Sequence, residues 1–459
     1  MFLLILSIES KFRPLLSNVT NNTHNLFKMS TPPDAYTYCF VSGKNWKLSL
    51  AELIAYFEAR QYVFQVTDYS RTFFTIKVNK PLPVSVIDEL GGILKIGEIT
   101  KIFSTELILD AFIKEQKQAK NQLDEELPVE IIAQKMSNQS SSKSLFGVSV
   151  YWSAELPFNA AGIRANRFLS SKIKQELKSQ GKSSRFMGFP DDRNQPQLTP
   201  VEVLKKGLVE TRSEVLFCVG KKQSSIGTTI SVHNPFEFQK RDVEKPIQRK
   251  IFGISPRIAK IMVNLSCCLE GKVFLDPFCG VGNILQEALL LNAKVIGLDI
   301  NRWCVDASRT NLEWLSQDYS LKNPDYMIFQ GDSRKLTMKI RDGIDCIATE
   351  PDLGPALRQI PTVAYATKLV DNLKPLFDDF LNQAYEVLNP EGHLVIVTPY
   401  VKTRVGKPVR LNIEPIAMQA GFTPVKIYQN ENFENQPTPP LSEAYSFIDV
   451  DERHIIGRE

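Results

Sequence analysis

The sequence predicts an α/β protein whose C-terminal half forms a doubly wound, mostly parallel sheet. The most informative stretch is residues 276–285, where an apolar run ends at Asp276 and a glycine turn leads into an apolar, helix-like segment. A buried strand, a glycine turn and a helix make the first βα unit of such a sheet, where nucleotide-like ligands bind. Gly280 and Gly282 would let the main chain approach a ligand that a Cβ would exclude.

Three further apolar runs support this fold class, because each leads into a carboxylate. Residues 294–299 end in Asp299, residues 326–332 end in Asp332, and residues 344–349 open into a proline-rich loop that starts at Glu350. An acid at the end of the second strand is placed to hold two ribose hydroxyls. Each acid alone would be an ordinary strand-end carboxylate, and only their order along the chain favours a binding site.

The composition is that of an ordinary globular protein, and 459 residues give room for two to four domains. The formal net charge of +4 is too small to argue for nucleic-acid binding by itself. Seven cysteines without a Cys-x-x-Cys pattern and four scattered histidines predict neither a metal site nor a disulfide framework. We therefore expect no bound metal and a reduced, cytoplasmic setting.

The first six residues are apolar but far too short to span a bilayer, which takes about 20 residues. No basic segment precedes them, as one would in a signal peptide. We therefore expect no membrane segment, and a disordered extension over residues 1–35, with Met29 as an alternative start of the protein.

The remaining N-terminal half divides into two blocks that mix strands and helices. Residues 36–113 follow the pattern strand, amphipathic helix, strand, with Ser49 as the expected helix cap. Residues 114–144 are first charged and then low in complexity, which predicts a linker. A second α+β block is expected over residues 145–235, and the doubly wound half over residues 236–459.

Basic residues gather in the second block and directly after it. Such a cluster is usually a solvated face, but positive charge also gives affinity for a nucleic-acid backbone. The cluster contains Arg164, Arg167, Lys172, Lys174, Lys178, Lys205, Lys206, Lys221, Lys222, Lys240, Arg241, Arg249 and Lys250.

The strand-end motifs together resemble those of the amino-methylating class of S-adenosylmethionine-dependent methyltransferases. The resemblance implies a Rossmann-like domain that binds S-adenosylmethionine. It places the loop that begins Asp276-Pro-Phe278 and continues through Gly280 and Gly282 near the methionine moiety. It also implies that Asp299 binds the ribose and that Asp332 lies near the adenine amine.

The segment between Arg241 and Leu265 has the form Arg-Asp…Pro…Ser-Pro-x-x-Ala-x-x-Met-x-Asn-Leu. It resembles the THUMP-containing tRNA guanine methyltransferases of the archaeal and eukaryotic type, which act on guanosine 10 of tRNA. Residues 36–113 look like their N-terminal ferredoxin-like module, and residues 145–235 like a THUMP RNA-binding domain. The implied activity is methylation of the exocyclic N2 amine of a tRNA guanosine, by a monomer or together with a small activating subunit.

The catalytic loop departs from the pattern of this class, which is Asp/Asn-Pro-Pro-aromatic. The aligned residues here are Glu350, Pro351, Asp352 and Leu353. Glu350 can still accept a hydrogen bond from an amine, with the main chain at Pro351 orienting it. Leu353, however, removes the aromatic ring that stacks on the target base, which is worth about 1–3 kcal/mol.

Three aromatic residues, Tyr365, Tyr400 and Phe252, are candidates to supply that ring instead. The altered loop also leaves open a non-catalytic RNA-binding protein that retains the fold. An adenine-N6 methyltransferase acting on DNA or RNA shares the motif order, and the loop cannot choose between guanine and adenine. The number of methyl groups added is not fixed by the sequence.

Overall fold

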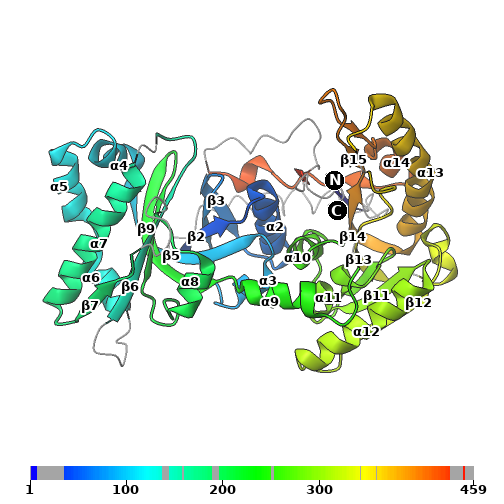
Figure 1. Ribbon diagram of the computed structural model, residues 1–459, viewed down its shortest axis with the longest axis horizontal. Coiled ribbons are helices and arrows are strands. Elements are labelled where there is room, and N and C mark those ends of the chain that lie inside the picture. Colours follow the sequence, from blue (N-terminus) through cyan, green and yellow to red (C-terminus); the bar gives the residue numbers. More distant parts are fainter. Residues whose placement is uncertain are drawn as a thin grey trace, which may run out of the picture.

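The computed structural model describes residues 2–7, 36–136, 144–157, 160–188, 196–249, 253–341, 343–357, 359–434 and 448–449. Two large sheets organise the described residues, one in the N-terminal half and one in the C-terminal half (Figure 1). Helix α10 (Pro256–Leu265) lies between them in the view of Figure 1.

The C-terminal half contains the doubly wound sheet that the sequence predicts. Its strand order is β12-β11-β10-β13-β14-β1-β17, and β18 also pairs with β1. The first five of these strands run parallel to one another. Their bounds are Tyr326–Gln330 for β12, Lys294–Asp299 for β11, Val273–Asp276 for β10, Ile344–Thr349 for β13 and Leu388–Thr398 for β14.

Both faces of this sheet are covered by helices. Apolar residues of α10, α11 (Asn283–Leu289) and α12 (Arg302–Asp318) pack on one face, where they meet Phe274 and Val295. The long helix α13 (Val363–Val387) and α14 (Glu414–Gln419) pack on the other face, where they meet Leu275 and Ile296. Neighbouring residues of one strand thus enter opposite cores, which explains why these strands are continuous apolar runs rather than alternating ones.

The prediction of a disordered extension over residues 1–35 is wrong for the first residues of the chain. Residues Phe2–Ser7 form strand β1, which pairs antiparallel with β14 from Phe2 opposite Thr398 to Ser7 opposite His393. Its other edge pairs with β17 (Thr423–Pro424) and, at Phe2 and Leu3, with β18 (Ile448–Asp449). Leu4, Ile5 and Leu6 are at most 2% exposed, so the apolar run is a buried central strand. Residues 8–35 lie outside the described part of the chain.

The same strand separates the last strands of the C-terminal half from one another in the sheet. The position between β17 and β14 is filled by β1 from the start of the chain. The small hairpin of β15 (Tyr400–Val401) and β16 (Val409–Arg410) follows β14 directly and pairs only with itself among the described strands.

The N-terminal half is built on one continuous sheet rather than on two separate ones. Its order is β3-β4-β2-β5-β9-β8-β6-β7, and the long strands β5 and β9 join the blocks expected at residues 36–113 and 145–235. The strands are β2 (Tyr36–Ser42), β3 (Phe64–Tyr69), β4 (Phe73–Val78), β5 (Ile93–Ser104), β6 (Ser144–Trp152), β7 (Ser184–Phe186), β8 (Glu214–Val219) and β9 (Gln223–Val232).

Helices cover this sheet, and two of them lie where a linker was expected. Helices α5 and α6 pack Leu123, Ile132 and Ala133 into the core shared by α7 and β6, so residues 117–135 belong to the second block. Residues 137–143 of the expected linker lie outside the described residues. The helices are α2 (Trp46–Ala59), α3 (Val86–Glu89), α4 (Thr105–Phe112), α5 (Lys117–Glu126), α6 (Val129–Lys135), α7 (Ala161–Ser179), α8 (Pro200–Lys205) and α9 (Pro235–Gln239).

Ser49 is not the cap of α2, as the sequence suggested. The helix begins at Trp46, and the Ser49 hydroxyl donates to the carbonyls of Asn45 and Gly92 from inside the helix. The bond to Gly92 ties the helix to the turn before β5. Thr199, by contrast, does cap α8, in a reciprocal capping box with Glu202.

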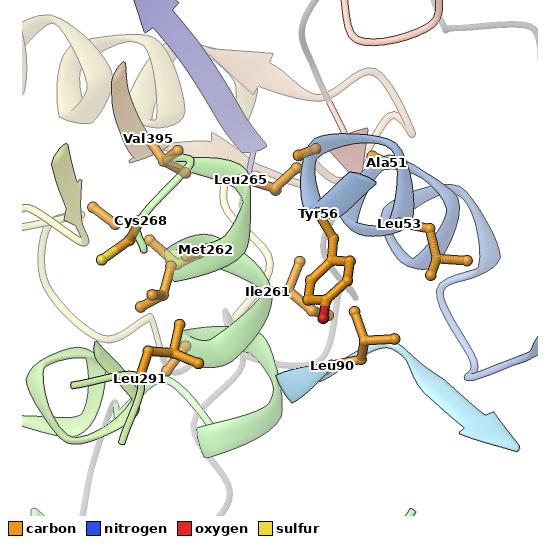
Figure 2. Close-up of a cluster of buried hydrophobic side chains, with 14 of the residues drawn as sticks. Ala51, Leu53, Tyr56, Leu90, Ile261, Met262, Leu265, Cys268, Leu291 and Val395 are labelled. Atoms are coloured by element: carbon orange, nitrogen blue, oxygen red, sulfur yellow. The ribbon is translucent and has the colours of Figure 1, made fainter. Parts of the chain in front are cut away.

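Helix α10 contributes to the apolar contact between the two halves, as does Phe433, whose ring centroid lies 5.9 Å from that of Tyr69. Figure 2 shows Ile261 directed towards Tyr56 and Leu90 of the N-terminal half, while Met262 faces Cys268 and Leu291 on the other side. One hydrophobic core therefore runs from α2 through α10 to the doubly wound sheet. The two halves are joined as one packed body.

Polar contacts buried beside α10 reinforce this connection. Glu287 of α11 pairs with Arg241 at 2.6 Å and with Lys260 at 3.2 Å, and its side chain is fully buried. Lys260 also donates to the carbonyl of Asp88 in the N-terminal half at 2.6 Å. Asn264 donates to the buried Glu52 of α2 at 2.7 Å.

Candidate active site at the carboxyl edge of the sheet

The parallel strands place their following loops along one edge of the sheet, and a cavity opens there. Its volume is about 430 Å³. Asp299 lines it from the end of β11, Glu350 from the end of β13, and Tyr400 from the end of β14. A smaller pocket of about 60 Å³ shares Glu350 with it and is lined by the glycine loop after β10. This carboxyl edge is where open α/β sheets bind ligands.

The glycine loop is shaped by two left-handed residues. Gly280 has φ +53° and Gly282 has φ +87°, a region that residues with a side chain rarely adopt. A Cβ on Gly282 would lie 2.5 Å from Oγ of Ser308 in α12, so this glycine is required for close packing against the next helix. At Gly280 the space is open, so its surroundings can accommodate a bound molecule.

Asp276 organises the start of the loop from a buried position. It is 1% exposed, and its Oδ1 accepts hydrogen bonds from the main-chain N–H of Phe278 and from the hydroxyl of Thr349. Burial raises the pKa of Asp276 to about 7, although both hydrogen bonds oppose the shift. The side chain joins β10 to β13. The Phe278 ring that follows it packs edge-on against Phe380 of α13, with ring centroids 5.2 Å apart.

Asp299 lies between the glycine loop and the cavity. Its Oδ2 accepts the N–H of Gly280 at 2.9 Å, and its Oδ1 accepts the N–H of Asn301 at 2.8 Å. A carboxylate oxygen can accept more than one hydrogen bond, so both oxygens keep acceptor capacity towards the cavity. The carboxylate is thus held in place by main chain, with its position fixed relative to the glycines.

Asp332 is placed differently from the other acids. It caps the short 3₁₀ turn of residues 333–338 and pairs with Arg334, whose nitrogens lie 2.7–3.1 Å from the carboxylate. The hydrogen bond from Arg334 lowers the pKa of Asp332. Asp332 follows β12 at the same sheet edge but does not line the described cavity. Its contact with an adenine amine stays a prediction.

Glu350 and Pro351 open the loop after β13. Burial, with a smaller contribution from the charge of Asp276, raises the pKa of Glu350 to about 7, while Arg249 opposes the shift. Pro351 is buried, whereas Asp352 is exposed and accepts the N–H of Gly354 at 2.9 Å. Asp352 therefore forms the turn of the loop, and Leu353 packs partly buried against both apolar cores.

The three aromatic residues considered as replacements for a loop ring have different positions. Tyr400 is half-buried and lines the cavity, whereas Tyr365 is 52% exposed on α13 and does not line it. Phe252 lies outside the described residues.

The cysteines at this edge of the sheet are poorly suited to act as nucleophiles. Cys279 and Cys304 are both buried. Burial raises the pKa of the Cys279 thiol well above its usual range, which disfavours the nucleophilic thiolate. Among the described residues, no group of three or more His, Cys, Asp or Glu side chains is arranged to hold a metal ion.

Several lining residues were not predicted from the sequence. Asn301 follows Asp299 at the end of β11, and Pro399 and Val401 follow β14, so the strand-end rule that selected Asp299 could have found both groups. Arg249, Ser255 and Ile258 come from the segment before the sheet, and no local pattern marks them as lining a cavity. The missed lining residues include Arg249, Ile254, Ser255, Ile258, Ile300, Asn301, Cys304, Pro399 and Val401.

The basic cluster is partly used inside the protein. Arg164 donates to the carbonyl of Phe112, Lys172 pairs with Asp124, and Lys240 pairs with Asp318. Arg167, Lys174 and Lys178 are exposed and lie on one face of α7, since they are spaced by seven and four residues. Arg241 is buried against Glu287, and Lys250 lies outside the described residues.

Comparison with known proteins assigns the C-terminal half to a family. The family model UPF0020, described as RMKL-like, methyltransferase domain, matches residues 248–405. A tRNA (guanine(10)-N2)-dimethyltransferase of Methanothermobacter thermautotrophicus is 32% identical over 159 residues, which are 34% of this chain and 42% of that protein. The chain spans less than half of the length of three such archaeal relatives.

A shorter relative is covered more completely. A probable tRNA (guanine(10)-N2)-dimethyltransferase of Methanothermococcus thermolithotrophicus is 30% identical over 145 residues, which are 31% of this chain and 79% of that protein. Among solved structures, TrmN from Thermus thermophilus aligns over 84% of this chain and 92% of its own, with 15% identity and a TM-score of 0.46. None of the helices in the described part of this chain has the length and apolar composition needed to cross a bilayer. The chain belongs to the methyltransferase family of the archaeal tRNA (guanine(10)-N2)-dimethyltransferases.

Proposed function

We propose that this protein transfers a methyl group from S-adenosylmethionine to the exocyclic N2 amine of a tRNA guanosine, at position 10 as in the names of its relatives. The observation that carries the proposal is that Asp299, the glycine loop and Glu350 meet around connected pockets at the carboxyl edge of the sheet. Family membership makes S-adenosylmethionine the expected methyl donor.

The residues at the edge fit such a cofactor. Asp299 is fixed by two main-chain N–H groups and keeps acceptor capacity for ribose hydroxyls. The main chain at Gly280 is open to the space in front of it, which suits the methionine part. Phe278 borders both pockets. When bound, the cofactor supplies an electrophilic methyl group on a sulfonium.

Glu350 is proposed to activate and orient the target amine. The lone pair of a guanine amine is conjugated with the ring, so the amine is a poor nucleophile. A carboxylate that accepts one of its hydrogens aligns it and takes up the proton released when the N–CH3 bond forms. The carbonyl at Pro351 can accept the second hydrogen. In this proposal Asp352 holds the turn of the loop and Leu353 forms an apolar wall.

The N-terminal half is proposed to bind the tRNA. The exposed basic residues Arg167, Lys174 and Lys178 form a positive stripe along α7, which suits a phosphate backbone. The ferredoxin-like and THUMP assignments of this half, its cytoplasmic location and the participation of a small activating subunit stay predictions.

Methyl transfer from labelled S-adenosylmethionine to unmodified tRNA tests the proposal. We expect transfer by the wild-type protein, with the product mapped to one guanosine, and loss of transfer in both Asp299→Ala and Glu350→Ala. Cofactor binding separates their roles, because Asp299→Ala should weaken it and Glu350→Ala should leave it nearly unchanged. Product analysis also gives the number of methyl groups.

A non-catalytic RNA-binding protein is the second candidate, and the observation that favours it is the replacement of the loop's proline and aromatic residue by Asp352 and Leu353. Binding of both tRNA and cofactor without transfer, including after addition of a cell extract that could supply a subunit, would support this candidate. A product mapped to an adenosine would instead assign the adenine-N6 activity.

A further inference from the structure

We propose that Tyr400 is the residue on which the target base stacks, in place of the ring that the loop after β13 lacks. This inference rests on the proposed function and specifies how the same site captures its substrate. It depends on the order of the strands and on what lines each part of the cavity.

The cavity extends across the carboxyl ends of four adjacent strands in the order β11, β10, β13 and β14. The cofactor-binding features lie at one end of this row, with Asp299 after β11 and the glycine loop after β10. Glu350 follows β13, the next strand. The substrate must therefore approach from the remaining side, over the ends of β13 and β14.

The walls on that side are mostly small or aliphatic. They are formed by Leu353 to Leu357 of the loop after β13, by Leu369 of α13, and by Pro399 to Val401. Tyr400 is the aromatic residue in this list. The other aromatic ring that lines the cavity, Phe278, follows β10 on the cofactor side and is packed edge-on against Phe380.

Strand register places Tyr400 near Glu350. Thr349 lies opposite Ile396, so the residue level with Glu350 is close to Val397, just before β14 ends at Thr398. Tyr400 begins the separate strand β15 directly after Pro399 and lines the same cavity as Glu350. Adjacent strands are about 4.8 Å apart, and each residue of a strand advances about 3.3 Å. A base whose amine contacts Glu350 therefore has its ring within reach of the Tyr400 side chain.

Two features fix the backbone at Tyr400. It is paired with Arg410 in the β15–β16 hairpin, and the adjacent Pro399 restricts the chain that leaves β14. The ring is half-buried, so one part is packed and another part borders the cavity. A planar, immobilised ring stacks on a base at low cost in conformational entropy.

The test compares Tyr400→Phe, Tyr400→Ala and Val409→Ala in methyl transfer to a tRNA transcript. Tyr400→Phe keeps the ring and should stay within about twofold of wild type, because stacking needs the ring and not the hydroxyl. Tyr400→Ala should lower kcat/KM for tRNA about tenfold, equivalent to about 1.4 kcal/mol, with KM for the cofactor unchanged. Val409→Ala perturbs the same hairpin without lining the cavity and should retain nearly full activity.

Binding to a transcript with an abasic site at the target position separates base stacking from general damage to the hairpin. Such damage would weaken the binding of both transcripts equally. The wild-type protein should bind the guanosine-containing transcript more tightly than the abasic one, and Tyr400→Ala should remove most of that difference. Equal weakening on both transcripts, or Tyr400→Ala activity within about twofold of wild type, would overturn the role of Tyr400. Absence of transfer by the wild-type protein, also after addition of a cell extract, would instead refute the proposed function, while the abasic comparison still decides on Tyr400.

Discussion

At the scale of single residues, Glu350 combines two requirements that oppose each other. In the proposed reaction it must be ionised to take up a proton from the amine, yet its burial disfavours its charge. The pKa of about 7 means that its ionisation changes within the physiological range. Catalytic groups are most effective with a pKa near the working pH.

The activity of the wild-type protein should therefore rise as the pH increases through about 7 and then level off. In Glu350→Gln the side chain still accepts a hydrogen bond but does not titrate, so activity should be lower and lack this rise. The measurement is kcat/KM for tRNA between pH 5.5 and 8.5. A rise with the same midpoint in Glu350→Gln would assign the titration to another group.

The same group makes a prediction for stability. Because its pKa is raised from 4.5 in the unfolded chain to about 7 when folded, Glu350 favours folding most below pH 4.5 and loses this contribution as the pH rises through 7. Glu350→Gln should accordingly raise Tm relative to wild type more at pH 8 than at pH 5. Asp276, which also has a raised pKa, should leave part of the pH dependence in place.

At the scale of elements, the glycine loop depends on the fit between α11 and α12. Gly282→Ala should destabilise the protein by about 2 kcal/mol or more through its left-handed backbone and abolish cofactor binding. A part of the lost stability comes from the contact of the new Cβ with Oγ of Ser308 at 2.5 Å. Adding Ser308→Ala to Gly282→Ala should therefore restore part of the free energy of unfolding.

Gly280→Ala is the matched control for that contact. The backbone of Gly280 is also left-handed, but a Cβ there meets nothing within 4 Å. Gly280→Ala should therefore lower the free energy of unfolding by less than Gly282→Ala does, and adding Ser308→Ala should not restore it. Urea unfolding of the single and double variants measures both effects. Equal losses at the two glycines would show that packing against α12 is not the constraint.

The elements also show how much of the fold could be predicted from the sequence. Four of the parallel strands of the doubly wound sheet were predicted within a few residues, because each is a continuous apolar run that ends in a carboxylate or a loop. Asp299 and Glu350 were placed at one edge by the same reasoning, and the structure brings them to one cavity. Their roles in binding and catalysis stay predictions.

The failures have a common physical origin in long-range packing. The charged helices α5 and α6 were expected in a linker because only their few apolar residues, such as Leu123 and Ile132, reveal that a core exists beside them. The strand β1 was missed because six residues alone do not indicate a partner strand at the far end of the chain. Tyr400 was a candidate beside Tyr365 and Phe252, but the sequence could not choose between them, since the choice depends on which strand lies beside β13.

At the scale of the whole molecule, the buried carboxylate of Glu287 holds Arg241 and Lys260, and Lys260 connects it to the N-terminal half. Glu287→Ala would leave two cations buried without their partner, which typically costs about 3–5 kcal/mol. Because Lys260 also bonds the carbonyl of Asp88, the variant should loosen the contact between the halves. We expect unfolding in calorimetry to split from one transition into two.

Glu237→Ala provides the control, because Glu237 faces the same Arg241 at 4.0 Å but is 45% exposed. An exposed pair of this kind is worth about 0–1 kcal/mol. Its unfolding should therefore stay close to that of wild type, and a similar loss in both variants would contradict a special role for the buried contact.

Strand β1 has a consequence for how the protein is made. β1 leaves the ribosome long before the strands on either side of it, β14 and β17, since Ser7 and Thr423 are separated by 416 positions. This apolar segment must therefore wait for the synthesis of more than 400 residues before its place in the sheet exists. Contacts so distant along the chain form slowly, and exposed apolar strands aggregate during such delays. During synthesis, the completion of this sheet therefore waits for β14 and β17, and chaperones would act on β1 before any other strand of the sheet.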